Sequence, residues 1–388
     1  MEKLPLRLTL ISVCLAAIVV VLGAFTRLAD AGLGCPDWPT CYGHLWVPTS
    51  AQDVAQANDA FAQTPVEHDK TWPEQLHRIV ASTLGLFILA IFFACASRYG
   101  NKRLWRTVNA YVGLLVAAVI GRIIFGAVLD PYLWVLIAGY FLNLARLAAH
   151  TQPHQVPFKL PSFIVGLVIL QGFFGMWTVT LNLWPQVVTM HLLGGFATFS
   201  LLWLLLQRLA AWGWEEKAAV VVRFMRLRPL ALLALVVVVI QIALGGWVSS
   251  NYAALACPDF PMCQNQVWPQ ANFAKGFNFA QHIGPNYLGG VLESDARIAI
   301  HFSHRLGAII VLAIVTALGV LLWNSGSKKA RCYAGLLWAA LLVQLSLGVL
   351  NVVLALPLFI AVAHNAVGAL LLVTVMTINH RIVTVKTL

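Results

Sequence analysis

Charged residues are scarce in this chain. Only 10% of its 388 residues are Asp, Glu, Lys or Arg, whereas 60% are hydrophobic, and the mean hydropathy is +0.82. A soluble domain usually carries about 25% charged residues, so the composition excludes an ordinary soluble protein. It predicts an all-α integral membrane protein, because helices satisfy their own backbone hydrogen bonds within lipid.

Acidic residues are especially few, with 14 Asp and Glu against 25 Lys and Arg, which gives a formal charge of +11. Such a basic excess can indicate a nucleic-acid partner, but its distribution predicts none. With the spans given below, 18 Lys and Arg but only 3 acidic residues fall on the side of the N-terminus. This positive-inside pattern places both termini in the cytoplasm, and we expect a multi-pass membrane protein.

Ten apolar stretches approach the roughly 20 residues that cross a bilayer. They cover about 6–25, 78–96, 110–129, 132–149, 162–181, 186–206, 229–249, 299–323, 331–354 and 358–379. No small-residue cleavage site follows the first stretch, so we expect it to remain as a span.

An internal repeat organises the chain. The segment 35–41 (CPDWPTC) recurs as 257–263 (CPDFPMC), and a His-Arg pair follows each copy, at 77–78 and at 304–305. Further along each half, a histidine follows a glutamine by 20 residues. The two halves are therefore expected to share one helical arrangement.

The two halves differ in one interval. The first and second repeated histidines are 114 residues apart in the first half and 60 in the second. The excess of 54 residues predicts an inserted helical hairpin at about 103–157. Without it, each half has four helices. The predicted fold is thus two pseudo-twofold-related four-helix transmembrane bundles plus the hairpin, with residues 1–212 as one half and 213–388 as the other.

Four histidines occupy equivalent places near the outer ends of their helices: His77, His191, His304 and His364. An ionisable residue at membrane depth is costly and indicates function. Histidines from two facing helices can ligate one haem iron, which predicts one haem site per half. Hydrogen bonding between helices is the alternative. Zinc is disfavoured, because neither half offers a compact Cys/His set.

Three charged residues accompany these histidines. Arg78 and Arg305 could pair with haem propionates or extend to the lipid headgroups. Glu74 lies one helical turn before His77, where the second half has His301. It could accept protons beside a metal site, or it could simply favour the helix N-terminus. The difference predicts one reactive site and one electron-transfer site.

The pairs Cys35/Cys41 and Cys257/Cys263 lie in outward loops, where disulfides can form. Their C-x5-C spacing matches no standard metal site. A structural disulfide and a redox-active pair both fit the sequence.

The chain closely resembles the heme A synthases, membrane enzymes that oxidise a methyl group of heme o to the formyl group of heme a. The resemblance covers nearly the whole chain and rests on segments 26–27, 32–39, 74–78, 175–179 with position 191, 301–305 and 364–365.

The resemblance implies particular roles. His77 and His191 would bind the substrate heme o, and His304 and His364 would hold a cofactor heme b. Glu74 matches an acidic residue beside the reactive site. Cys35/Cys41 matches an outer-loop pair that is associated with disulfide formation. The inserted hairpin departs from the eight-span family pattern.

The resemblance also implies partners. These are heme o and heme a, the heme o synthase (protoheme farnesyltransferase), cytochrome oxidase assembly factors and membrane lipid; a homo-oligomer is also compatible with the sequence. Two other functions remain open: a diheme electron carrier of the quinol-oxidising cytochrome b type, and a non-enzymatic haem-transfer or assembly protein. The Glu74/His301 difference argues against the carrier.

Overall fold

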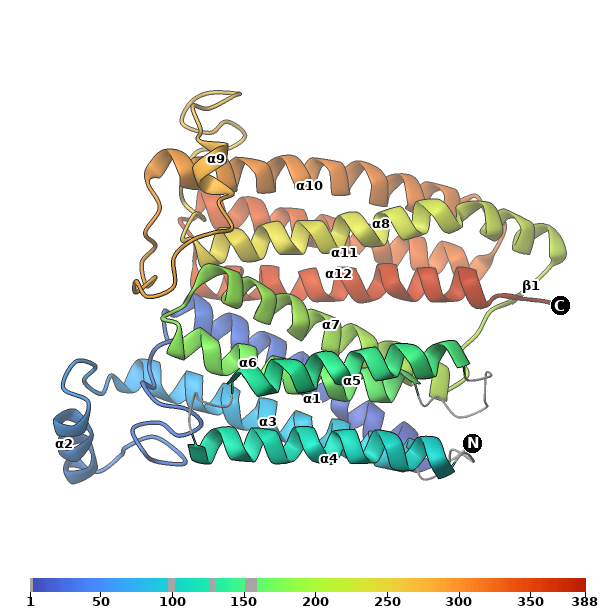
Figure 1. Ribbon diagram of the computed structural model, residues 1–388. Helices are drawn as coiled ribbons and strands as arrows, with labels where there is room; N and C mark the ends of the chain where they lie inside the picture. Colours follow the sequence, from blue (N-terminus) through green and yellow to red (C-terminus); the bar gives the residue numbers. More distant parts are fainter. Residues whose placement is uncertain (1–2, 97–101, 126–129, 151–158) are drawn as a thin grey trace.

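The computed structural model describes residues 3–96, 102–125, 130–150 and 159–388 (Figure 1). Long helices dominate the described chain. They are α1 (Lys3–Leu28), α3 (His68–Ala96), α4 (Lys102–Phe125), α5 (Asp130–His150), α6 (Lys159–Thr180), α7 (Pro185–Leu209), α8 (Ala218–Ser250), α10 (Ser294–Trp323), α11 (Lys328–Val353) and α12 (Leu358–Thr384). The shorter elements are α2 (Ala51–Ala60), α9 (Phe273–Gly276), β1 (Glu215–Glu216) and β2 (Lys386–Thr387).

The prediction of an all-α integral membrane protein is confirmed. Among the described residues, eight helices are long and apolar enough to cross a bilayer: α1, α3, α6, α7, α8, α10, α11 and α12.

The residues at the starts of the helices explain where the helices begin. Pro185 stands in the first turn of α7, where its missing N–H costs nothing. The Ser327 hydroxyl caps α11 by accepting from the Ala330 N–H at 3.1 Å.

Each half of the chain forms a closed ring of four helices. In the first ring α1 contacts α3, α3 contacts α6, α6 contacts α7, and α7 returns to α1. The second ring repeats this order with α8, α10, α11 and α12. Helices α1 and α7 of the first ring pack against α8 and α12 of the second. The arrangement matches the predicted pair of related bundles, and it leaves α3 diagonal to α7 and α10 diagonal to α12.

The predicted insertion appears as the helices α4 and α5, which lie along the first ring (Figure 1). Their most apolar described stretches, Asn109–Ala118 and Tyr132–Ala145, are shorter than those of the other long helices. The helix α5 joins the hairpin to α6. Trp134 stacks on Trp177 with ring centroids 4.9 Å apart. The Tyr140 hydroxyl donates to the Ser162 carbonyl at 2.7 Å.

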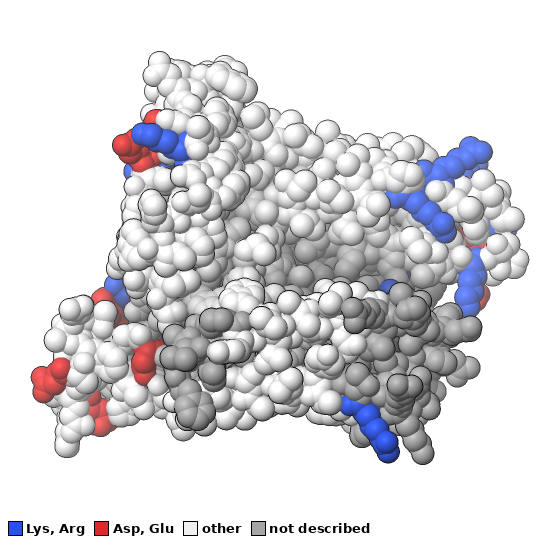
Figure 2. All heavy atoms as spheres, in the orientation of Figure 1, with Lys and Arg blue, Asp and Glu red and all other residues white. Residues whose placement is uncertain are grey.

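The two ends of the molecule differ in charge. Figure 2 shows Asp and Glu mainly at the end that carries α2 and α9, whereas Lys and Arg predominate at the end where the chain termini lie. At that basic end, β1 and β2 pair in parallel, so the last residues of the chain lie beside the link between the two rings. Basic residues therefore gather at the end of the molecule that carries the termini, as the sequence predicts.

We expect Gly166→Val to loosen the hairpin. A Cβ at this position would come within 2.7 Å of the Tyr140 ring, so α5 must move away from α6. Such overpacking typically costs about 1–3 kcal/mol. The thermal unfolding midpoint of the purified protein should fall, and the fluorescence of the Trp134–Trp177 stack should change.

The matched control is Gly139→Val on α5, where an added Cβ meets no atom within 4 Å. Equal midpoints for the two variants would contradict the proposed contact between α5 and α6.

Candidate functional site

Two of the four repeated histidines meet inside the first ring. His77 on α3 and His191 on α7 come from diagonal helices, and their ring centroids lie 6.3 Å apart with the planes at 88°. The Nδ1 atoms of both rings are covered by the surrounding described residues. Two imidazoles that face each other inside the ring form a donor set suited to a metal centre.

The second ring brings together the other two histidines. His304 on α10 and His364 on α12 lie close enough for their charges to interact. The Gln241 amide Nε2 donates to the His304 carbonyl at 2.9 Å and lies 3.1 Å from its Nδ1. The Gln344 carbonyl lies 3.2 Å from the His364 Nδ1. Side-chain and main-chain groups therefore orient the histidines of this ring, as is usual around metal ligands.

A glycine on the neighbouring helix of the ring faces each of these histidines. A Cβ added at the glycine would lie between 2.9 and 3.4 Å from the histidine Cε1. The pairs are Gly23–His77, Gly175–His191, Gly245–His304 and Gly348–His364. Since small residues let membrane helices approach closely, these glycines make room for an imidazole between helices.

The residues present fit a haem in each ring. Each site offers two half-buried histidines from diagonal helices, and the surrounding spans are apolar. In the part of the chain that the structure describes, no group of three or more His, Cys, Asp or Glu side chains gathers as a metal-ion site. The arrangement thus suits a prosthetic group that brings four ligands of its own.

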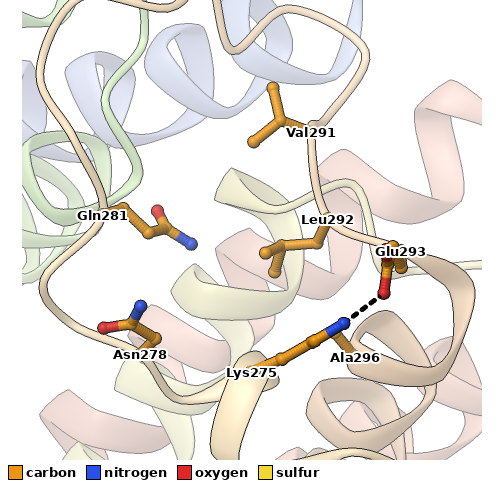
Figure 3. Close-up of a pocket in the computed structure, with 7 residues that line it drawn as sticks. All are labelled: Lys275, Asn278, Gln281, Val291, Leu292, Glu293 and Ala296. Carbon is orange, nitrogen blue, oxygen red and sulfur yellow. Dashed lines mark hydrogen bonds and ion pairs between the residues drawn. The ribbon is translucent and has the colours of Figure 1, made fainter.

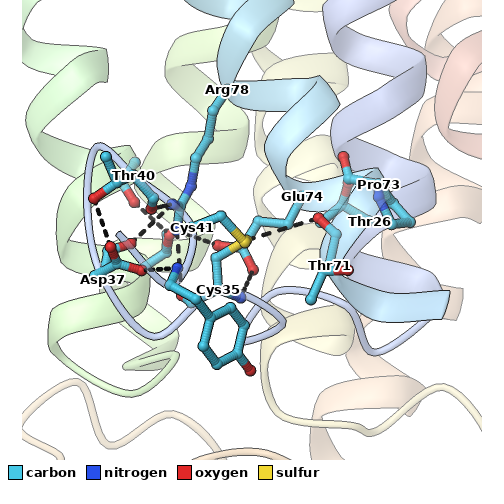
Figure 4. A network of polar contacts seen from close by, with 12 residues as sticks. Thr26, Cys35, Asp37, Thr40, Cys41, Thr71, Pro73, Glu74 and Arg78 are labelled. Atoms are coloured by element: carbon cyan, nitrogen blue, oxygen red, sulfur yellow. Dashed lines mark hydrogen bonds and ion pairs between the residues drawn. A yellow bond between two sulfur atoms is a disulfide. The ribbon is translucent and has the colours of Figure 1, made fainter. Parts of the chain in front are cut away.

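The outer end of α3 holds the first cysteine loop through one ion pair (Figure 4). The buried Glu74 carboxylate accepts from Arg78 at 2.5 Å and from the Cys35 backbone N–H at 2.9 Å. The Arg78 guanidinium also donates to the carbonyls of Asp37 and Thr40, both at 2.8 Å. A third donation goes to the Cys35 carbonyl at 3.4 Å, so a single arginine binds the Glu74 carboxylate and three loop carbonyls.

The second ring repeats this arrangement with a different acceptor. The His301 Nδ1 accepts from the Cys257 N–H at 3.3 Å, and the Arg305 Nε lies 3.2 Å from the His301 Nε2. The Arg305 guanidinium donates to the carbonyls of Asp259, Met262 and Cys257 between 2.7 and 2.9 Å. Glu74 and His301 thus occupy the same place in the same clamp.

These contacts add a structural role for Arg78, Arg305 and Glu74, which is to hold the cysteine loops. Both guanidiniums bind loop carbonyls, a use that the sequence analysis did not foresee. Pairing of Arg78 and Arg305 with propionates stays a prediction, as does proton acceptance by Glu74. The carboxylate is 4% exposed, and Arg78 supplies the counter-charge that a buried anion needs.

Both cysteine pairs are bonded, as Cys35–Cys41 and Cys257–Cys263. All four cysteines are at most 1% exposed. Because thiol–disulfide exchange needs access to a sulfur atom, this burial favours the structural role over the redox-active one. Beside the first pair, burial and then the charges of Glu67, Glu74 and Asp37 raise the pKa of Tyr42 to about 12.

The second outer loop, residues 251–293, reaches across to the first ring. The Trp184 indole N–H donates to the Gln281 carbonyl at 3.1 Å, and the Tyr287 N–H donates to the Asn182 carbonyl at 3.0 Å. The same loop forms a shallow hollow closed on one side by the Lys275–Glu293 ion pair at 2.6 Å (Figure 3). None of the four repeated histidines lines it.

Several residues that contact the site histidines were not predicted from the sequence. Gln241 has no counterpart in the first ring, where the repeat places Val19. Gly348 was not recognised, although its position relative to His364 matches that of Gly175 relative to His191. Aligning the two halves residue by residue would have found Gly348.

The chain is similar over its whole length to proteins of one kind. The sequence profile of the cytochrome oxidase assembly protein family matches residues 6–130 and 119–376. A heme A synthase of Shewanella oneidensis is 40% identical over 375 residues, which cover 97% of this chain and 94% of the relative. The heme A synthases of Caulobacter sp. strain K31 and Wolbachia pipientis wMel are 25% and 26% identical, over 98% and 96% of this chain and 96% and 91% of their own lengths.

We expect Arg78→Gln to expose the first disulfide. The change removes the guanidinium that the Glu74 carboxylate and three loop carbonyls share, and breaking a buried ion pair typically costs about 3–5 kcal/mol. Reduction under native conditions, followed by alkylation and mass spectrometry, should then modify Cys35 and Cys41 faster than in the parent protein.

The pair Cys257–Cys263 in the same molecule is the internal control, and Arg305→Gln should reverse the preference. If both pairs of the Arg78→Gln variant react at the parental rate, the arginine does not hold the loop.

Proposed function

This chain belongs to the cytochrome oxidase assembly protein family, and we propose that it is a heme A synthase, which oxidises a methyl group of heme o to the formyl group of heme a. The observation that supports this most is a pair of diagonal histidines in each ring, in a chain 40% identical to a heme A synthase over nearly its full length. The reaction would make it an oxidoreductase acting on a CH3 group.

The two halves would divide the work. We propose that residues 1–212 bind the substrate heme o through His77 and His191, and that residues 213–388 bind heme b through His304 and His364. Bound heme b would supply electron transfer. The protein's part is to orient the imidazoles, through Gln241 and Gln344 in the second ring, and to exclude water by the apolar packing of each bundle.

Glu74 would act as the proton acceptor of the first half. Oxidation of a methyl carbon releases protons, and an ionised carboxylate one helical turn from His77 can take them up. Arg78 and the Cys35 N–H fix the carboxylate in position. The equivalent His301 keeps the loop clamp but carries no negative charge, which supports a reactive first site and an electron-transfer second site.

We place the protein in the bacterial inner membrane with both termini in the cytoplasm, because the basic end carries the termini (Figure 2). The outer loops would then face the oxidising compartment, where disulfides persist. The proposed partners are the heme o synthase, which would supply the substrate, and cytochrome oxidase assembly factors, which would receive heme a.

A diheme electron carrier is the second candidate. It is favoured by one observation: Glu74 and His301 make equivalent contacts, so the two outer ends are more alike in structure than in sequence. In a carrier both haems would be permanent.

The haem content distinguishes these functions. We expect protein purified from cells that make heme o to contain heme b together with heme o, its hydroxylated form or heme a, as measured by chromatography and mass spectrometry of the extract. His304→Leu should deplete heme b first, because it removes a ligand of the second ring only.

Heme b alone, despite available heme o, would favour the electron carrier. Unchanged heme b in His304→Leu would overturn the proposed division between the halves.

Two substitutions at Glu74 separate proton transfer from loop clamping. Glu74→Gln removes the charge at nearly constant volume, and we expect the fold and bound haem to persist while aldehyde formation falls about 10²–10⁴-fold. Glu74→His installs the acceptor that the second ring uses, so it should keep the Cys35–Cys41 loop closed yet remain inactive.

Product formation is measured by mass spectrometry of extracted haem, and loop closure by disulfide accessibility. Full activity of Glu74→Gln would remove Glu74 from the mechanism, and full activity of Glu74→His would reduce its role to the clamp.

A further inference from the structure

Two arginines occupy equivalent positions at the basic end of the molecule. Arg208 follows His191 by 17 residues on α7, and Arg381 follows His364 by 17 residues on α12. Because α7 and α12 pack against each other across the boundary between the rings, the internal repeat brings the two arginines to the same seam. The haem chemistry proposed above uses neither of them.

Arg381 is buried without a counter-charge. It is only 5% exposed, and its Nε and Nη1 atoms have no hydrogen-bond partner within the described chain. No ion pair found among the described residues includes Arg208 or Arg381. A guanidinium that is buried without a counter-charge destabilises the folded state. An anion bound beside Arg381 would therefore stabilise the protein.

The neighbours of Arg381 are polar but supply no negative charge. One turn before it, the Thr377 hydroxyl accepts from the Trp203 indole at 2.8 Å and from the Gln207 amide at 3.4 Å. The Gln207 Oε1 is buried and has no partner among the described residues. His380 lies close enough to feel the charge of both Arg381 and Arg208. The seam therefore holds three basic side chains.

The position excludes the haem propionates of either ring as the anion. Seventeen residues of helix span about 25 Å at 1.5 Å per residue, which puts the arginines near the membrane face opposite to the histidines. That depth is where the phosphates of lipid headgroups lie, on the face that carries most of the Lys and Arg. Arg208 is exposed, so a headgroup can reach its guanidinium.

We propose that the seam between α7 and α12 binds the phosphate group of an anionic phospholipid, held between the guanidiniums of Arg381 and Arg208. The planar fork of arginine matches phosphate oxygens in a bidentate geometry. Such a phosphate would place a negative charge beside the unpaired Arg381 and join the two rings at their basic end. The inference does not depend on which haem each ring holds.

The test compares the thermal unfolding midpoint of the purified full-length protein in neutral detergent, with and without added phosphatidylglycerol. Phosphatidylcholine and inorganic phosphate serve as separate additions. We expect phosphatidylglycerol to raise the midpoint of the parent protein by about 2–4 °C, because a ligand that binds only the folded state stabilises it.

The variants are Arg381→Gln and Arg208→Gln, with Arg226→Gln as the control. Arg226 is exposed near the same end on α8, so the control loses one positive charge outside the seam. Arg226→Gln should respond to phosphatidylglycerol as the parent does, whereas the two seam variants should lose the shift. Without lipid, Arg381→Gln should unfold no earlier than the parent, because it removes a buried unpaired charge.

Native mass spectrometry provides a second measurement, which should find one phosphatidylglycerol retained by the parent and by Arg226→Gln but not by Arg381→Gln. A shift from inorganic phosphate alone that Arg381→Gln abolishes would support the phosphate site and identify free phosphate as its source. An unaltered lipid response and lipid retention in Arg381→Gln would overturn the proposal. So would an equal stabilisation by phosphatidylcholine in all variants.

Discussion

The close approach of neighbouring helices at four histidine–glycine contacts is the constraint on which this structure depends. Each histidine ring fills the space that a side chain would otherwise occupy on the next helix of its ring. In lipid, where no hydrophobic effect drives helices together, small residues permit the contact that holds them. The same contact directs each imidazole inward, toward its partner on the diagonal helix. Packing and site geometry therefore share one cause.

The outer clamps show how a duplicated fold tolerates a chemical difference. Glu74 and His301 both accept a backbone N–H from the first cysteine of their loop, and both contact the arginine four residues later. Since either residue closes the loop, folding does not require a carboxylate at one end and an imidazole at the other. The difference in charge is then best explained by the chemistry beside each site, which supports unequal functions for the two halves.

Much of the architecture could be predicted because it depends on properties that repeat locally. Apolar length gave the spans, and the unequal histidine intervals gave the hairpin, which the structure shows as Lys102–Phe125 and Asp130–His150. The partners of Arg78 and Arg305 could not be predicted in this way. Their carbonyls belong to loop residues more than 35 positions away, and the loop path decides which carbonyl turns inward. Gln241 escaped notice for a related reason, since only the packed helices place it beside His304.

The arginines at the two ends of the molecule meet the same physical demand in different ways. A guanidinium at the edge of the apolar layer must pair its donors. At the acidic end, long loops fold back and offer carbonyls to Arg78 and Arg305. At the basic end, the described connections are short, the link from α7 to α8 covering residues 210–217, and Arg381 keeps two donors free. Where the polypeptide offers no acceptor, the membrane itself can, because its phosphates lie at this depth. One arginine of the basic end would then serve as a ligand-binding group between the two rings.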